Sequence, residues 1–248
     1  INAALASYPE LNCDGKATEL YTGTEVGFST LCTRKEITYE FVNDVVKEIS
    51  GLTPGPYFHI GGDETHATAH EDYVYFINRV QEIVVSHGKK VMGWDEIAKA
   101  ELVNEAVVQF WDNAENTTMA AEQGAKVIMS PASRAYLDMK YDSTTHLGLN
   151  WAGYIEVNTA YNWNPVTLIP GITKENILGI EAPLWTETIS NMDELEFMVF
   201  PRLPGFAEIG WTAPEVRNWE EYKMRLAAHG QRFEAMKINF YRADVGTW

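Results

Sequence analysis

Short apolar segments that alternate with amphipathic helical segments constrain the fold of this chain more than any other feature. Five apolar segments have the length of buried strands, at residues 57–60, 90–94, 107–111, 126–130 and 177–181. Before, between and after them, apolar residues recur at helical spacing, most clearly at residues 37–49, 73–84 and 219–236. A further short helix is expected near Glu101. Strands that alternate with helices predict a parallel sheet with right-handed crossover connections.

Trp, Asp, Glu or Tyr follows the strand segments at their carboxyl ends, which is where a (β/α)₈ barrel carries its active site. A doubly wound open sheet is the alternative, but no glycine-rich phosphate loop accompanies any strand. We therefore predict an α/β fold of the (β/α)₈ TIM-barrel class. About five strands are found where a closed barrel needs eight. We expect residues 1–248 to be one partial catalytic barrel domain, strands 4 to 8 with the loop after strand 3, and the first three βα units to be missing from this sequence.

The stretch Tyr57-Phe58-His59-Ile60-Gly61-Gly62-Asp63-Glu64-Thr65-His66 contains the strongest candidate site. On a regular strand Asp63 and Glu64 point to opposite faces, but a strand that ends at the two glycines lets both reach one pocket. Two carboxyl groups held together do not titrate alike, so one can stay protonated while the other is ionised. The pair therefore suits acid–base chemistry, with a solvated loop or a helix N-cap as the alternative.

The same stretch holds side chains that could bind a metal: His59, Asp63, Glu64, His66 and His70. Neither a His-x-x-x-His pair on a periodic helix nor a cysteine pair at zinc spacing accompanies them. We predict no metal and no cofactor. His59 is interpreted as a buried, hydrogen-bonded histidine that supports the acids, and His66 and His70 as loop residues.

The net charge of the chain limits the classes of partner that it can bind. The chain has 19 Lys and Arg against 35 Asp and Glu, a formal net charge of -16, which argues against nucleic acid or an anionic membrane as partner. Neutral or cationic ligands fit better. No apolar run reaches the roughly 20 residues needed to cross a bilayer. The chain opens at Ile1 without a methionine, and we expect that a preceding segment has been removed.

Residues 1–31 are rich in turn formers and predict a long loop, which in a compact domain is usually functional. Two cysteines, Cys13 and Cys32, flank most of this segment. A disulfide between them suits an exported protein, and two free buried thiols suit a cytosolic one. We favour the disulfide.

With these strand ends in view, the chain resembles the catalytic domain of glycoside hydrolase family 20, the β-N-acetylhexosaminidases, and most closely its secreted bacterial members. The resemblance covers essentially the whole chain. It is carried by the blocks Asn2-Ala3-Ala4-Leu5-Ala6-Ser7-Tyr8, His59-Ile60-Gly61-Gly62-Asp63-Glu64, Gly93-Trp94, Gln109-Phe110-Trp111, Tyr136-Leu137-Asp138-Met139-Lys140-Tyr141, Ala182-Pro183-Leu184-Trp185-Thr186-Glu187 and Phe200-Pro201-Arg202-Leu203-Pro204.

The resemblance implies three catalytic residues. Glu64 is the general acid that protonates the glycosidic oxygen and then the base that activates water. Asp63 accepts a hydrogen bond from the 2-acetamido N–H of the sugar. Tyr136 donates to the acetamido oxygen, which itself attacks the anomeric carbon and gives an oxazolinium intermediate. This substrate-assisted route is an exception to the usual scheme of two carboxylates.

The resemblance also implies a sugar-binding pocket. Indole rings suit the apolar C–H faces of a sugar, and its hydroxyl groups need acceptors at fixed positions. The expected walls are Trp94, Trp111 and Trp185, the expected hydroxyl ligands are Asp138 and Glu187, and Trp151 is expected to stack on the next sugar. Relatives use further polar residues from the first three strands, and those positions are not in this sequence.

The resemblance therefore implies a secreted, retaining exo-β-N-acetylhexosaminidase that removes terminal β-linked GlcNAc or GalNAc. One alternative is a carbohydrate-binding fragment without turnover. Another is a family relative that releases a disaccharide, because loops such as residues 148–164 set the depth of the pocket. A metal-dependent hydrolase is a third, and its activity would be lost to EDTA.

Overall fold

Five short strands form the sheet in the computed structural model, which describes residues 1–246 and residue 248. They are β1 (Tyr57–His59), β2 (Lys90–Trp94), β3 (Val107–Phe110), β4 (Lys126–Met129) and β5 (Ile177–Ile180), and their order in the sheet is the order of the sequence. The pairs β1–β2 and β2–β3 are parallel, with Tyr57 opposite Lys90 and Met92 opposite Val107. All five predicted strand segments are therefore confirmed.

The chain divides into two compact units, residues 1–127 and residues 128–248, and each is described here by itself. The helices of the first unit are α1 (Asn2–Ser7), η1 (Pro9–Leu11), α2 (Glu36–Leu52), α3 (His70–Ser86), η2 (Asp95–Lys99) and α4 (Ala114–Glu122). Those of the second are α5 (Ala132–Ala135), α6 (Val157–Tyr161), α7 (Met192–Val199), α8 (Leu203–Trp211), η3 (Pro214–Val216) and α9 (Trp219–Ala235). No helix of the described residues is long and apolar enough to span a bilayer.

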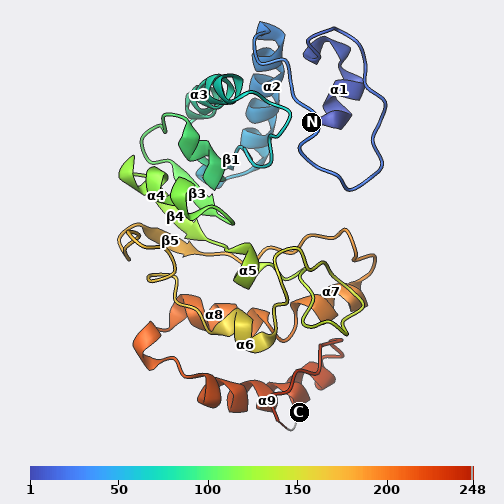
Figure 1. The fold of residues 1–248 in the computed structure, drawn as a ribbon, viewed down its shortest axis with the longest axis vertical. Helices are drawn as coiled ribbons and strands as arrows, with labels where there is room; N and C mark the ends of the chain where they lie inside the picture. The colour runs from blue at the N-terminus through green and yellow to red at the C-terminus, as the bar shows by residue number, and fades with distance from the viewer. Residues whose placement is uncertain (247) are drawn as a thin grey trace. The chain divides into compact units, whose positions relative to one another are not determined.

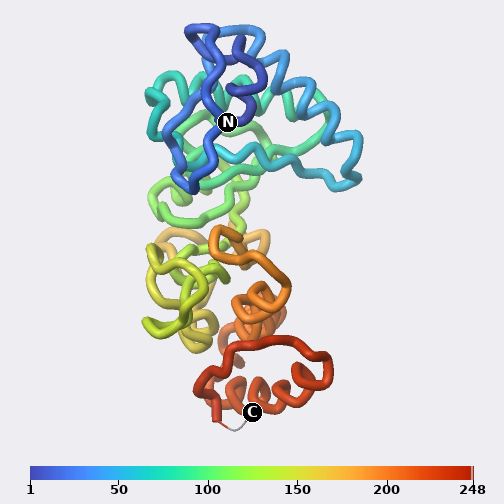
Figure 2. Tube along the Cα trace, turned by 90° about the vertical axis from the view of Figure 1, so that its right-hand side faces the viewer, coloured from blue at the N-terminus to red at the C-terminus, as the bar shows by residue number. Residues whose placement is uncertain are grey.

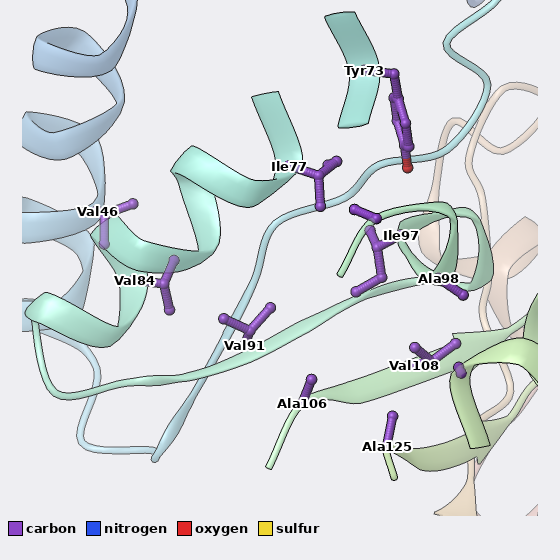
Figure 3. Packing of buried hydrophobic residues seen from close by; sticks show 12 residues of the cluster. Val46, Tyr73, Ile77, Val84, Val91, Ile97, Ala98, Ala106, Val108 and Ala125 are labelled. Carbon is purple, nitrogen blue, oxygen red and sulfur yellow. The ribbon is translucent and has the colours of Figure 1, made fainter. Parts of the chain in front are cut away.

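The core of the first unit lies between the helices α2 and α3 and the strands. Val46 on α2, Val84 on α3 and Val91 on β2 are each at most 2% exposed. Figure 3 shows these three side chains in the space between the helices and β2, with Ile77 pointing toward Ile97, and Figure 1 shows α2 and α3 side by side. Burial of one such side chain contributes about 1.5–3 kcal/mol, so the apolar face of α3 holds the helix against the sheet.

Aromatic stacking organises the second unit. Tyr161 at the end of α6 stacks on Tyr222 of α9 with ring centroids 4.2 Å apart. The tail after α9 turns back along that helix, as the dark-red trace shows in Figure 2, and Phe240 lies 5.0 Å from Phe233. The peptide N–H of Tyr241 in this tail donates to the carbonyl of Phe200. These contacts connect α6, α9 and the segment before α8.

Two predictions about local structure were wrong in part. The loop expected at residues 1–31 is found at residues 12–31, but α1 and η1 form before it because Leu5 and Leu11 are buried, at 2% and 1% exposed. A short helix was expected near Glu101, whereas the helical turn is η2, which starts directly after β2. Ile97 of η2 is fully buried, so packing of this side chain draws the turn toward the strand.

The preferred disulfide is confirmed, since Cys13 and Cys32 are bonded. The loop that it closes contacts the segment after β1. The carbonyl of Gly27 accepts a hydrogen bond from Ala67 N–H at 2.9 Å, and the Thr68 hydroxyl donates to that of Thr30 at 2.7 Å. The disulfide therefore restrains a loop that packs beside the candidate acids.

We expect replacement of both cysteines by serine to lower the free energy of unfolding by about 3 kcal/mol, because the bond closes a loop of 19 positions in the unfolded chain. Urea denaturation measures this difference. Reduction of the wild-type chain should reproduce the effect, and the reducing agent should not change the variant. Equal stability of the oxidised wild type and the variant would contradict the prediction.

Candidate active site

The turn after β1 is fixed by packing and places two acids beyond the end of the strand. Gly62 has φ 103°, and a Cβ atom there would lie 2.6 Å from the Ile97 side chain, so only glycine fits. Its carbonyl accepts a hydrogen bond from the Tyr73 hydroxyl at 2.8 Å. Figure 3 shows both of these neighbours. Asp63 and Glu64 therefore leave the sheet from a fixed point.

Glu64 combines a sparsely populated backbone conformation with partial burial. Its φ of 48° lies in the left-handed region, which for a non-glycine residue is concentrated at functional sites. The side chain lines a cavity of about 360 Å³. Burial raises the pKa of Glu64, and the neighbouring Asp63 raises it further, against an opposing effect of His66. This is the direction expected from the sequence, and it helps the carboxyl group to keep its proton.

Aromatic and acidic side chains from the next two strand ends lie at the same site. Trp111 and Glu96 line the cavity with Glu64, and the ring of Trp94 lies 6.5 Å from that of Trp111. Burial, with the adjacent Asp95, raises the pKa of Glu96 to about 7. Asp95 and Glu96 were not among the predicted site residues, although their position directly after a strand is the signal that could have indicated them.

Two of the three histidines of this region, His59 and His70, differ from their predicted environments. His59 was expected to be buried, but it is exposed, because β1 is the first strand in the sheet order and only β2 flanks it. Its Nδ1 atom accepts from Gly61 N–H at 3.1 Å, and its ring lies 5.3 Å from that of Trp94. His66 lies in the loop and lines the cavity, whereas His70 is not a loop residue and begins α3.

Among residues 1–246 and 248, no three or more His, Cys, Asp or Glu side chains are grouped closely enough to hold a metal ion.

Tyr136 is the centre of an aromatic group in the second unit. It follows α5 and is only 3% exposed. The ring of Trp151 lies 5.9 Å from it in an edge-on arrangement, and the ring of Trp185 lies 6.1 Å away. Trp151 and Trp185 are 55% and 42% exposed, so solvent reaches part of each residue.

Asp138 lies next to this aromatic group and is 1% exposed. Its Oδ1 atom accepts a long hydrogen bond of 3.4 Å from Trp185 N–H, and its Oδ2 atom has no partner among the described residues. A buried acceptor that makes no hydrogen bond costs about 1–3 kcal/mol. Burial raises the pKa of Asp138 to about 6, and the exposed Glu187 adds to the rise. Oδ2 is thus an available acceptor for a hydroxyl group.

The structure groups the predicted site residues within each unit. The first unit brings together Asp63, Glu64, Trp94 and Trp111, and the second brings together Tyr136, Asp138, Trp151, Trp185 and Glu187.

Comparisons with known proteins agree on one family. The catalytic-domain model of glycosyl hydrolase family 20 matches residues 1–73 and 66–214. A β-N-acetylhexosaminidase of Cellulomonas fimi is 45% identical over the whole chain, which covers 51% of that protein. The family 20 β-N-acetylhexosaminidase structure of Streptomyces coelicolor A3(2) matches the whole chain at 53% identity with a TM-score of 0.97.

A structure of the Streptomyces plicatus enzyme in complex with thio-NAglucal matches equally well, at 52% identity and a TM-score of 0.97. The chain spans about half the length of these relatives. The parallel sheet with its helices and these neighbours confirm the predicted fold class, part of a (β/α)₈ barrel.

We expect Asp138→Asn to change how stability depends on pH. The folded-state pKa of about 6 lies above the ordinary value of 3.8, so the folded chain binds more protons between these values. The contribution of Asp138 to the free energy of unfolding is therefore fully present below the unfolded-state pKa. It is lost as pH rises through the folded-state pKa, by up to about 3 kcal/mol. Urea unfolding across this window should show a smaller loss in the variant. Asp193→Asn, an exposed change on α7, serves as the control, and parallel curves for D138N and wild type would contradict the prediction.

Proposed function

The chain belongs to glycosyl hydrolase family 20, and on this premise we propose that the protein that contains it is a retaining exo-β-N-acetylhexosaminidase. Its substrates are terminal β-linked GlcNAc or GalNAc residues. The observation that supports this most is Glu64, a partly buried carboxyl group with a raised pKa, which lines a cavity beside Trp111 at the carboxyl end of a strand. A mutant of the Streptomyces plicatus enzyme was solved in complex with the product GlcNAc.

In the proposed mechanism the substrate supplies the nucleophile. Glu64 gives its proton to the glycosidic oxygen while the acetamido oxygen attacks the anomeric carbon, so that the bond to the leaving group breaks and an oxazolinium ion forms. The Glu64 carboxylate then takes a proton from the water that opens this ion, and the configuration is retained. The raised pKa of Glu64 supports the first step, since a general acid works best with a pKa near the working pH.

Asp63 and Tyr136 control the acetamido group in this proposal. Asp63 accepts a hydrogen bond from the N–H of the acetamido group and stabilises the positive charge that develops there. This interaction is stronger where water is excluded. Tyr136 donates its hydroxyl proton in a hydrogen bond to the acetamido oxygen. Burial of the Tyr136 ring in contact with two indoles supports this role, because a packed ring keeps its hydroxyl in place.

The remaining predicted residues bind the sugar. We assign Trp94, Trp111 and Trp185 to the walls of the pocket, Trp151 to stacking on the next sugar, and Asp138 and Glu187 to outer hydroxyl groups. The unpaired Oδ2 atom of Asp138 and the exposed ring of Trp151 support these roles. The disulfide supports export of the protein, because such bonds persist in oxidising compartments.

Glu64→Gln should reduce kcat/KM for oligosaccharides with poor leaving groups by about 10²–10⁴-fold, because the leaving oxygen then receives no proton. Aryl glycosides with good leaving groups depend less on the acid and should retain more activity. Steady-state kinetics on the protein that contains this chain measure both. Glu71→Gln, an exposed change in the first turn of α3, is the matched control. Unchanged cleavage of the poor substrates by E64Q would refute the acid role.

A thiazoline mimic of the cyclised intermediate should bind at least about 100-fold more tightly than GlcNAc, because binding is strongest for structures that resemble the transition state. Titration calorimetry measures both affinities. Equal affinities would exclude substrate assistance. Binding of GlcNAc without hydrolysis of a chromogenic hexosaminide would instead favour the carbohydrate-binding alternative.

A further inference from the structure

Asp95 holds the loop that follows β3. It is fully buried, and its Oδ2 atom accepts hydrogen bonds from the peptide N–H groups of Trp111, Asp112 and Asn113 at 3.2–3.3 Å. Its Oδ1 atom accepts from the Asn116 side chain at 2.9 Å. A buried carboxylate is tolerated when hydrogen bonds satisfy its oxygens, and bonds to a charged group are the stronger kind. One side chain thus fixes three consecutive peptide groups between β3 and α4.

Glu96 holds the side chain of the first residue in the same loop. The indole Nε1–H group of Trp111 donates to Glu96 Oε2 at 3.1 Å. Trp111 is therefore restrained twice, through its peptide N–H by Asp95 and through its ring by Glu96. Asp95 and Glu96 both lie in η2, which follows β2 without a gap. The restraint on the loop after β3 therefore comes from the turn at the end of the neighbouring strand.

We propose that Asp95 and Glu96 are positioning residues that together set the orientation of the Trp111 indole, and with it one wall of the sugar pocket. The consequence for sugar binding rests on the proposed function, whereas the orientation of Trp111 does not. An indole wall gains from a fixed orientation because a ring that is ordered before binding loses less entropy when the sugar arrives.

The hydrogen bond from the Trp111 indole to Glu96 should depend on pH because of where Glu96 lies. The groups that face its carboxyl are Asp95 on η2, Asp63 after β1 and Tyr73 on α3, and the shared cavity adds Glu64, His66, His70, Lys99 and Asp112. Burial and Asp95 raise the pKa of Glu96 to about 7. Above that pH the acceptor is a carboxylate and binds the indole N–H more strongly than the protonated acid does.

The test for Glu96 follows the Trp111 indole N–H resonance in protein labelled with ¹⁵N-tryptophan, with Trp111→Phe to assign it. We expect the resonance to titrate with a midpoint near pH 7. Glu96→Gln keeps an acceptor oxygen but not the charge, so the titration should disappear while the resonance stays sharp. Glu96→Ala should displace or broaden it. Glu122→Gln, an exposed change on α4, should leave the wild-type titration intact. The role of Glu96 is overturned if the chemical shift of the resonance does not change with pH, or if E96A neither displaces nor broadens it.

The test for Asp95 needs no variant. The amides of Trp111, Asp112 and Asn113 lie outside β3, so without Asp95 they would exchange with solvent as fast as those of an ordinary loop. We expect hydrogen exchange to show them protected. Fast exchange of all three overturns the role of Asp95.

Affinity for the thiazoline separates this inference from the proposed function. E96A should weaken binding at least about tenfold and E96Q by no more than about twofold, differences that calorimetry resolves. If the wild-type protein does not bind the thiazoline but the resonance behaves as expected, the positioning role holds and the proposed function is wrong. If the thiazoline binds and E96A changes neither the resonance nor the affinity, the positioning role is wrong.

Discussion

A buried guanidinium group bonded to main-chain carbonyls is the interaction on which the site residues of the second unit depend. Arg202 is 1% exposed, lies 3.9 Å over the ring of Tyr141, and donates to the carbonyls of Leu137, Met139, Ile155 and Met198. Leu137 and Met139 flank Asp138, and Tyr136 precedes them. Because this segment belongs to no strand or helix, its carbonyls need partners from elsewhere. Arg202 supplies them for Leu137 and Met139, and Leu149 N–H donates to the Asp138 carbonyl, so that these bonds together fix the segment that carries the candidate site residues.

The first unit uses the same solution with the opposite charge. There Asp95 accepts from peptide N–H groups after β3, as Arg202 donates to carbonyls after α5. Burying either charge costs several kcal/mol, which only well-placed hydrogen bonds offset. Such a group is stable in one loop conformation and costly in any other, because a shifted loop leaves the charge unpaired. Each buried charge therefore lowers stability in every loop geometry except one. A single geometry suits candidate site residues, because a ligand must be met at fixed distances.

Local signals in the sequence predicted the strands and indicated much of the candidate site, but they did not predict the hydrogen bonds of Arg202 and Asp95 to main-chain groups. The strands could be predicted because each apolar segment is bounded by turn residues, and the strand-end rule then indicated Glu64, Trp94 and Trp111. Arg202 and its partner Met139 are 63 positions apart, and no short-range pattern pairs them. The exposure of His59 was missed for a similar reason, since the alternation within a strand does not show what lies at the edge of the sheet.

The left-handed backbone of Glu64 shows how several restraints combine at one residue. A conformation of this kind costs about 1–3 kcal/mol and persists only when the surroundings hold it. The packing of Gly62 against Ile97 limits the turn on one side. On the other side Gly27, with φ 74°, approaches so closely that an added Cβ would lie 2.6 Å from the Glu64 carbonyl oxygen. Since Gly27 belongs to the loop closed by Cys13 and Cys32, the disulfide, far from the acid in sequence, helps to hold its backbone in place.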